Sequence, residues 1–358
     1  MGIAVSKGMS QRYTEEAGAV YEQIQEAEVE RLEKEAPVAG KGADKMQVSA
    51  DGAMVPLLHG VWAEARTVAI GEVHSVVKPN GESEAQAHNL SYFSRKANAE
   101  AFQRLALVEM HRRGVENAKE VAAIMDGAEW EQGFTDYHCP QAVRILDFPH
   151  AAEHVNHIGE ALYGEHTPES QAWLEDRLHR LKQLGPNELL LEFQQLRQDH
   201  PGVEAIARNV TYLEKRIAQM QYPQFRAQGW PIGSGMVESA NKLVVEARLK
   251  GSGMHWAEHH VNPMLAIRNI ICSDRWKEDW PKIEMGLRQQ AWSNKLKLHQ
   301  SRKPPPSPPR QPIIDERVVQ SVIARQEQQN EPGKPKLNPW RKFKFGKALY
   351  QPATPAKN

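Results

Sequence analysis

The stretch Val121-Ala-Ala-Ile-Met-Asp126-Gly127 is an apolar run that ends in Asp-Gly, and Met46-Gln-Val-Ser-Ala-Asp51-Gly52 has the same design. Each run predicts a buried strand, and each Asp-Gly pair predicts a turn. Two such strands side by side can bring both carboxylates to one point at the rim of a sheet. Hard divalent cations favour oxygen ligands held in this way, with room for water and phosphate. The alternative for either aspartate alone is an ordinary turn residue.

Other periodic stretches predict an α/β core that is interrupted by a helical block. Residues 171–221 repeat apolar side chains at helical spacing, from Trp173 and Leu178 onward, and give no strand signal. The block therefore separates two pieces of the α/β core. Before the core, we predict a solvated helix at 11–35 and a linker at 36–45. Within the core, we predict strands at 54–58 and 66–73 that complete a meander, a mainly helical stretch at 84–110 with a short strand at 105–108, and a strand at 142–146 that ends at Asp147. Further helices are predicted at 150–163, 236–249 and 257–272.

A third acidic residue follows the helical block. The segment Gly229-Trp-Pro-Ile-Gly-Ser-Gly-Met-Val-Glu238 predicts a turn that enters a helix, with Ser234 as the N-cap. Glu238 then lies in the first helical turns, where a carboxylate also favours the helix dipole and can pair with Lys242 four residues later. A catalytic role and this structural role both fit the spacing.

Composition limits the class of protein without naming it. The 358 residues carry 45 Lys and Arg against 45 Asp and Glu, so net charge gives no sign of a nucleic-acid partner. Two distant cysteines form neither a zinc-finger pair nor a disulfide framework, which fits a reducing cytoplasm. No apolar run approaches the roughly 20 residues that span a membrane.

Taken together, the acidic segments resemble bacterial insertion-sequence transposases of the ISKra type, within the Mutator-related DDE group. The segments that carry the resemblance are Ser49-Ala-Asp51-Gly-Ala-Met-Val-Pro-Leu57, Asp126-Gly-Ala-Glu-Trp130, Ile145-Leu-Asp147-Phe-Pro-His150-Ala151, and Glu238 continued to Arg248-Leu-Lys-Gly-Ser-Gly-Met-His-Trp256. The likeness covers about residues 46–285, and its last segment is the most specific.

The resemblance implies an RNase H-like mixed sheet flanked by helices, with an all-α insertion before the last catalytic acid. It implies that Asp51, Asp126 and Glu238 hold two Mg²⁺ or Mn²⁺ ions and catalyse DNA strand cleavage and strand transfer. DNA ends and target DNA are the implied partners of a homo-oligomer near the bacterial nucleoid. The expected divisions are an N-terminal helical remnant and linker at 1–45, the catalytic core at 46–165 and 227–300, the insertion at 166–226, and a Pro-rich basic tail at 301–358.

Further residues are implied in supporting roles. Asp147 and His150 resemble the Asp/Cys-x-x-His signature of related transposases, which lies near the active site; the alternative for His150 is packing against the sheet. The cations Lys242, Arg248 and Lys250 neutralise phosphates in this interpretation, or are simply solvated, and Trp256 belongs to the same motif. His150, His154 and His157 lie on one helix face at a spacing that could bind zinc, but they have no partner cysteine, and His138-Cys139 is a similarly weak candidate.

Two alternatives to the transposase stay open. One is a structure-specific nuclease on the same scaffold. The other is a catalytically idle DNA-binding protein, because family members carry a longer N-terminal DNA-binding region. Trp173 is expected to pack in the core, with stacking on a flipped base as the alternative, and the aromatic and basic residues of 336–347 are a candidate DNA contact or a solubilising tail.

Overall fold

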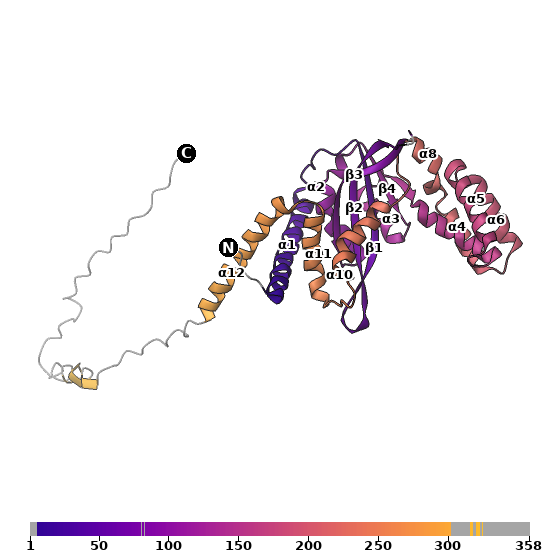
Figure 1. Cartoon of the computed structure of the whole chain (residues 1–358). Helices are drawn as coiled ribbons and strands as arrows, with labels where there is room; N and C mark the ends of the chain where they lie inside the picture. Colours follow the sequence, from indigo (N-terminus) through magenta and orange to yellow (C-terminus); the bar gives the residue numbers. More distant parts are fainter. Residues whose placement is uncertain are drawn as a thin grey trace, which may run out of the picture. The chain divides into compact units, whose positions relative to one another are not determined.

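The computed structural model describes residues 6–79, 81 and 83–301, together with a few positions at 316–317, 320–322 and 324. Its centre is a five-stranded sheet with the strand order β3-β2-β1-β4-β5 (Figure 1). β2 is antiparallel to β1 and β3, whereas β4 and β5 run parallel to β1. The strands are β1 (Lys45–Pro56), β2 (Trp62–Val77), β3 (Ser83–Arg95), β4 (Glu120–Met125) and β5 (Val143–Leu146).

Helices surround this sheet, so the expected α/β class, with a mixed sheet flanked by helices, is confirmed. They are α1 (Lys7–Glu35), α2 (Ala99–Arg112), α3 (Glu129–His138), α4 (Phe148–Tyr163), α5 (Pro168–Leu184), α6 (Asn187–Asp199), α7 (Glu204–Glu214), α8 (Tyr222–Ala227), α9 (Gly235–Ala240), the π-helix η4 (Asn241–Glu246), α10 (Ala247–Leu249), α11 (Glu258–Cys272) and α12 (Trp276–Ser301). The tail prediction at 336–347 lies outside the described residues.

The first strand does not end at Asp51, so the predicted turn at Asp51-Gly52 is wrong. β1 stays paired with β2 from Met46↔Glu72 to Pro56↔Trp62, and Gly52 lies within that ladder opposite Arg66. Continuous cross-strand pairing satisfies the backbone of both strands, and this outweighs the local turn preference of Asp-Gly. Of the predicted strand at 54–58, residues 54–56 are the end of β1, and Leu58 begins a short 3-10 helix, η1 (Leu58–Gly60).

The stretch at 84–110 is also different from its prediction. Its first part is strand β3, which pairs with β2 along most of its length, and its second part is helix α2, which contains the predicted strand at 105–108. Glu84, Ala85, Gln86 and Ala87 favour helices as single residues. Alternation of polar and apolar side chains and pairing with β2 override that weak preference.

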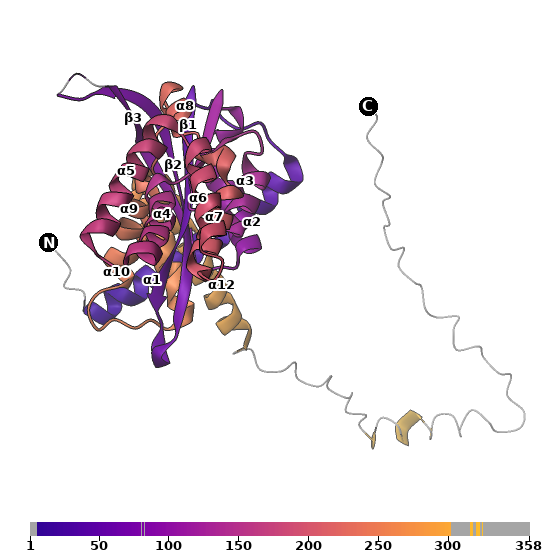
Figure 2. The ribbon, with the colours of Figure 1, turned by 90° about the vertical axis from the view of Figure 1, so that its right-hand side faces the viewer.

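The two faces of the sheet bury different helices. Side chains of alternate residues in a strand point to opposite faces. Met46, Val48 and Ala50 therefore pack on one face with Phe102 of α2 and Phe134 of α3. The other face is covered by two further groups, the helical block α4–α8 over β4 and β5, and α9 to α11 over β1 and β2. Figure 2 views the protein from the side of the helical block, where α4, α5, α6 and α7 stand in front of the sheet.

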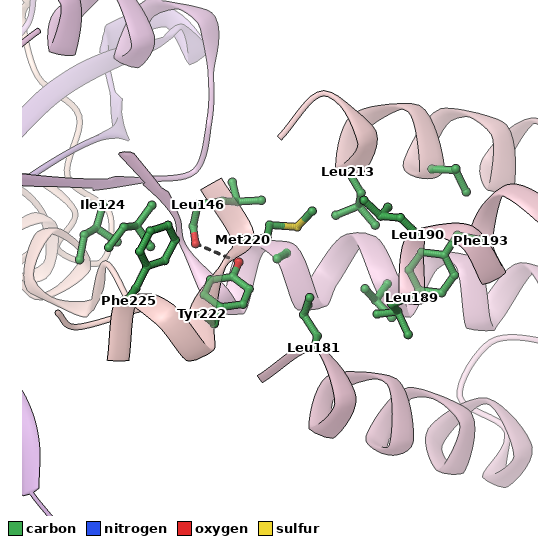
Figure 3. Close-up of a cluster of buried hydrophobic side chains, with 14 of the residues drawn as sticks. Ile124, Leu146, Leu181, Leu189, Leu190, Phe193, Leu213, Met220, Tyr222 and Phe225 are labelled. Atoms are coloured by element: carbon green, nitrogen blue, oxygen red, sulfur yellow. Dashed lines mark hydrogen bonds between the residues drawn. The ribbon is translucent and has the colours of Figure 1, made fainter. Parts of the chain in front are cut away.

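The helical block shares its core with the sheet. Figure 3 shows Ile124 of β4 and Leu146 of β5 beside Phe225 and Tyr222 of α8, and the Tyr222 hydroxyl donates a 3.0 Å hydrogen bond to the Leu146 carbonyl. Leu189, Leu190 and Phe193 continue the buried cluster into α6. The predicted helical character of 171–221 is confirmed, and its apolar faces meet in one core with β4 and β5.

Trp173 belongs to that core. Its side chain is 7% exposed, and its ring stacks on Phe193 at a centroid distance of 5.9 Å. Gly159 of α4 lies against the indole so closely that an added methyl would approach it to 2.8 Å. The expectation of core packing is confirmed, and the alternative role in base stacking is excluded because the ring is covered.

Helix α1 is less solvated than its sequence indicates. Ala17, Val20 and Tyr21 are buried in a cluster with Ala266, Ile267 and Ile270 of α11. An added methyl on Gly18 would meet the Pro263 carbonyl oxygen at 2.0 Å, so a glycine is needed where the two helices touch. The N-terminal helix is thus packed against the same unit as the sheet. None of the helices within the described residues has the length and apolar character needed to cross a membrane.

Replacing Trp173 with alanine tests the packing of the block. We expect Trp173→Ala to lower the free energy of unfolding by about 3–5 kcal/mol, because it leaves a cavity between α4, α5 and α6. Trp292→Ala is the control, since Trp292 is 66% exposed. Chemical denaturation of both variants measures the difference, and equal midpoints would show that the core is not closed around Trp173.

Candidate acidic metal centre

Strand register brings three aspartates to one level of the sheet. In the parallel ladder of β1 and β4 each residue pairs with the residue 75 positions later, as Val48 does with Ala123. Continued past this last pair, the same offset sets Asp51 level with Asp126. β4 and β5 pair with an offset of 21 residues, which sets Asp126 level with Asp147. Because paired residues of parallel strands point to the same face, all three belong to the face that carries α9.

Asp51 is held by two hydrogen bonds. The Gly52 amide donates to Oδ1 at 2.6 Å, and Nδ2 of Asn241 donates to Oδ2 at 2.8 Å. Burial raises the pKa of the Asp51 carboxyl, and the Gly52 amide opposes that rise while the charge of Asp126 adds to it. Asn241 is the first residue of the π-helix η4, a widened helical turn of the kind often found at functional sites.

Glu131 is the third member of the cluster, and sequence reasoning missed it. One carboxylate oxygen from each of Asp51, Asp126 and Glu131 lies within 4.8 Å of the others. Glu131 is 1% exposed and accepts a 3.1 Å hydrogen bond from the Gly127 amide through Oε2. Burial, with the Asp126 carboxyl beside it, raises the pKa of Glu131 to about 10. The signal in the sequence was a second acid five residues after Asp126, at the start of a helix.

The loop that carries Asp126 is fastened to helix α7. The Tyr212 hydroxyl donates to the Asp126 carbonyl, and Nη2 of Arg216 donates to the Gly127 carbonyl at 2.5 Å. The Arg216 guanidinium lies 3.7 Å from the centroid of the Tyr212 ring. The His154 ring stacks on the same ring at a centroid distance of 3.7 Å. The helical block therefore positions the loop on which the second aspartate lies.

Asp147 ends β5 and begins α4. Its Oδ2 accepts from the His150 amide at 3.2 Å as an N-cap, and its Oδ1 accepts from the Ser234 amide at 2.5 Å. Burial raises the pKa of this carboxyl, and the two amides oppose that rise. Asp147 thus ties the turn at 229–235 to the end of β5, which places the start of α9 beside the acidic cluster. Ser234 occupies the predicted N-cap position but makes no side-chain cap bond.

Glu238 lies beside the cluster and is not part of it. Its side chain is exposed on α9, and its carboxylate does not belong to the group of three converging acids. Burial is the largest cause that raises the pKa of Asp51 and of Asp147, and the charge of Glu238 adds to the rise. Asn241, one turn further along, is the residue of this helix that touches Asp51.

Trp256 and Arg248, in the motif that follows Glu238, make structural contacts. Trp256 is buried; its indole donates to the Leu249 carbonyl at 3.1 Å, and its backbone forms a bridge with Leu57 just after β1. The Arg248 guanidinium lies 5.0 Å from the Trp256 ring centroid. Lys250 pairs with Glu246 at 2.7 Å, and Lys242 is exposed. Arg248 and Trp256 therefore hold the segment after α10 in place.

The histidines of α4 make contacts that suit packing. Nδ1 of His154 lies 2.7 Å from the Asn209 side-chain oxygen, and His150 lies 3.5 Å from Glu153 and edge-on to Tyr212. Within the described residues, the only group of three or more potential metal ligands is Asp51, Asp126 and Glu131. The histidines of α4 and the His138-Cys139 pair do not form such a group.

The residues present fit a hard divalent cation. All three converging ligands are carboxylates, and no Lys, Arg or His within the described residues forms an ion pair with any of them. Two buried oxygens at the cluster, Oε1 of Glu131 and Oδ1 of Asn241, have no hydrogen-bond partner there. Amide donors orient these carboxylates but leave their charges in place, so a cation among them would relieve both the repulsion and the missing contacts.

Tyr212→Phe tests the attachment of the Asp126 loop. The substitution removes one hydrogen bond and keeps the stacked ring, so we expect a loss of about 0.5–1.5 kcal/mol in the free energy of unfolding. Tyr163→Phe is the matched control, because Tyr163 lies on the neighbouring α4 and is 48% exposed. Denaturant titration provides the measurement, and equal losses in both variants would contradict a special role for the Tyr212 hydroxyl.

His138 provides a pH-dependent test away from the cluster. Burial lowers its pKa from an ordinary 6.5 to about 4. Between these values the unfolded chain binds a proton that the folded chain does not, so stability falls as pH falls, by at most about 3 kcal/mol. His138→Gln is expected to flatten the change in unfolding free energy between pH 7.5 and pH 4. The exposed His200→Gln is the control, and an unchanged slope in His138→Gln would refute the assignment.

Comparison with known proteins adds no relative to this description. No protein-family model matches the chain, and no curated protein shows a significant similarity to it. The resemblance to ISKra-type transposases therefore stays a prediction, and the chemistry of the acidic cluster is inferred from its own residues.

Proposed function

We propose that the protein is a DNA transposase that cleaves and joins DNA strands by metal-dependent phosphoryl transfer. The observation that carries the proposal is the convergence of Asp51 and Asp126 at one level of neighbouring parallel strands, with Glu238 on the adjacent helix. Three carboxylates of this kind suit one or two ions that are shared with phosphate oxygens.

The arrangement of the sheet supports an RNase H-like fold. Three antiparallel strands followed by two parallel ones, in the order β3-β2-β1-β4-β5, form the mixed sheet that the resemblance implies. The helical block lies between β5 and α9, which is where an insertion before the last acid is expected. Asp147 then serves as the residue that joins the end of β5 to the turn before Glu238.

The residues that would hold Mg²⁺ or Mn²⁺ are the converging Asp51, Asp126 and Glu131, and Glu238, exposed on α9 beside them, would reach an ion that is shared with DNA phosphate. Such ions, when bound, activate water or a DNA 3′-hydroxyl and stabilise the leaving oxygen. The protein supplies rigid positions for its carboxylates. Asn241 and the Gly52 amide fix Asp51, and the Ala128 amide donates to Oδ1 of Asp126 at 2.7 Å.

Cationic side chains near the cluster suit a polyanionic substrate. A cleft of about 530 Å³ is lined by Lys78, Lys182 and Arg226, with Glu84 paired to Lys78, and it reaches Gly233 in the turn that contacts Asp147. Lysine and arginine side chains favour the phosphates of the DNA backbone. Lys242 is exposed close to Glu238 on the same helical segment and is proposed as a further phosphate contact. The resemblance adds the proposal that the chain acts on DNA as a homo-oligomer.

Asn241→Ala and Asp51→Asn test this function together. We expect Asp51→Asn to reduce strand cleavage to background, and Asn241→Ala to reduce it about 10–100-fold, because Asn241 orients Asp51 without replacing it. The assay is Mg²⁺- or Mn²⁺-dependent nicking and strand transfer with a plasmid that carries the DNA flanking the reading frame.

Asp199→Asn is the control, since this carboxylate is exposed at the end of α6. Cleavage without strand transfer would favour the structure-specific nuclease. Metal-independent DNA binding without cleavage by the wild-type protein would favour an idle DNA-binding protein and contradict the proposal.

A further inference from the structure

Two buried side-chain oxygens of residues at the acidic cluster have no hydrogen-bond partner. Among the described residues, four buried side-chain polar atoms have no hydrogen-bond partner: Nε of Arg66, Oγ of Ser91, Oε1 of Glu131 and Oδ1 of Asn241. The last two belong to side chains at the acidic cluster, from two elements that are about 110 residues apart in the sequence. A buried oxygen acceptor without a donor is costly, and a bound cation or its water would supply the missing contact to both oxygens.

Glu131 has the geometry of an inner ligand. It lies in the first turn of α3 with its side chain 1% exposed, and its other oxygen already accepts the Gly127 amide. The remaining oxygen has no partner, and the carboxylates of Asp51 and Asp126 lie within 4.8 Å of the Glu131 carboxylate. A surface role is excluded, because the side chain does not reach solvent.

Asn241 is independent support for a ligand at this point. Its side chain is 5% exposed, and it already donates to Asp51 through Nδ2 while its carbonyl oxygen has no partner. Amide oxygens, like carboxylates, are ligands for hard cations or for the water molecules around them. Asn241 is not an acid, so its unmet acceptor does not follow from crowding of carboxylates.

We propose that Asp51, Asp126 and Glu131 form a binding site for one divalent cation that is complete without Glu238 and without DNA. Asn241 closes this site by holding Asp51 and by offering an oxygen to the ion or its water. Glu238 is exposed beside the site, and it would bind a second ion that DNA phosphates also help to bind. The inference deepens the proposed function, because it divides the acidic residues between a resident ion and a DNA-dependent one.

The test is binding of Mn²⁺ to the full-length, DNA-free protein, measured by the loss of the free-ion electron paramagnetic resonance signal. We expect Glu131→Gln to weaken the tightest site at least about 10-fold, because it removes one of three charged ligands. Glu238→Gln is expected to leave that site within about twofold of wild type. Glu129→Gln is the matched control: it removes an exposed carboxylate from the same helical turn and is expected to have no effect.

Equal affinity of wild type and Glu131→Gln, equal weakening by Glu238→Gln, or no Mn²⁺ binding by the wild type would each overturn the inference. A thermal melt in chelator verifies that each variant is folded. If Glu131→Gln does not fold, Glu131→Asp shortens the ligand and is expected to weaken the site about 10-fold; wild-type affinity there would overturn the inference as well. A wild type that binds Mn²⁺ through Glu131 but cuts no DNA would refute the proposed function alone. A wild type that cuts DNA but binds Mn²⁺ independently of Glu131 would refute the inference alone.

Discussion

Three neighbouring parallel strands, β1, β4 and β5, determine where the acidic side chains of this protein lie. Hydrogen bonds between β1, β4 and β5 fix which residues are level, and a slip of one residue in either ladder would turn an aspartate to the opposite face. Continued past the last paired residues, this register sets Asp51, Asp126 and Asp147 level on one face. Every other feature of the site, including the turn before α9 and the loop held by α7, is arranged around that line of carboxyl groups.

A line of partly buried acids needs hydrogen-bond donors, and the chain provides neutral ones. Backbone amides of Gly52, Gly127 and Ala128, together with the side-chain amide of Asn241, donate to the three converging carboxylates. Amide donors orient a carboxylate without neutralising its charge. The cluster therefore keeps its attraction for cations, which an arginine in the same position would remove.

Much of the architecture could be predicted from local patterns, but the third converging acid could not. The buried strand before Asp126, the helical block and the helix after Glu238 have clear periodicity, and each is present. The predictions of a turn at Asp51-Gly52 and of a mainly helical stretch at 84–110 are wrong because pairing with β2, which lies elsewhere in the sequence, decides the structure of both segments. In the sequence, Glu131 looks like an ordinary first-turn glutamate. Its burial indicates a metal site only because the strand register brings Asp51 and Asp126 next to it.

The shared core of the helical block and the sheet has a consequence for how this chain can be divided or recombined. Tyr222 and Phe225 fill the space over β4 and β5, and Tyr212 reaches the loop after β4, so the block is part of the unit that carries the acidic cluster. An insertion that is only tethered by its two ends can be exchanged between related proteins as a module. This block cannot, since its removal would open the apolar face of two strands to water. Changes in its helices and changes in the strands beneath them must therefore be inherited together.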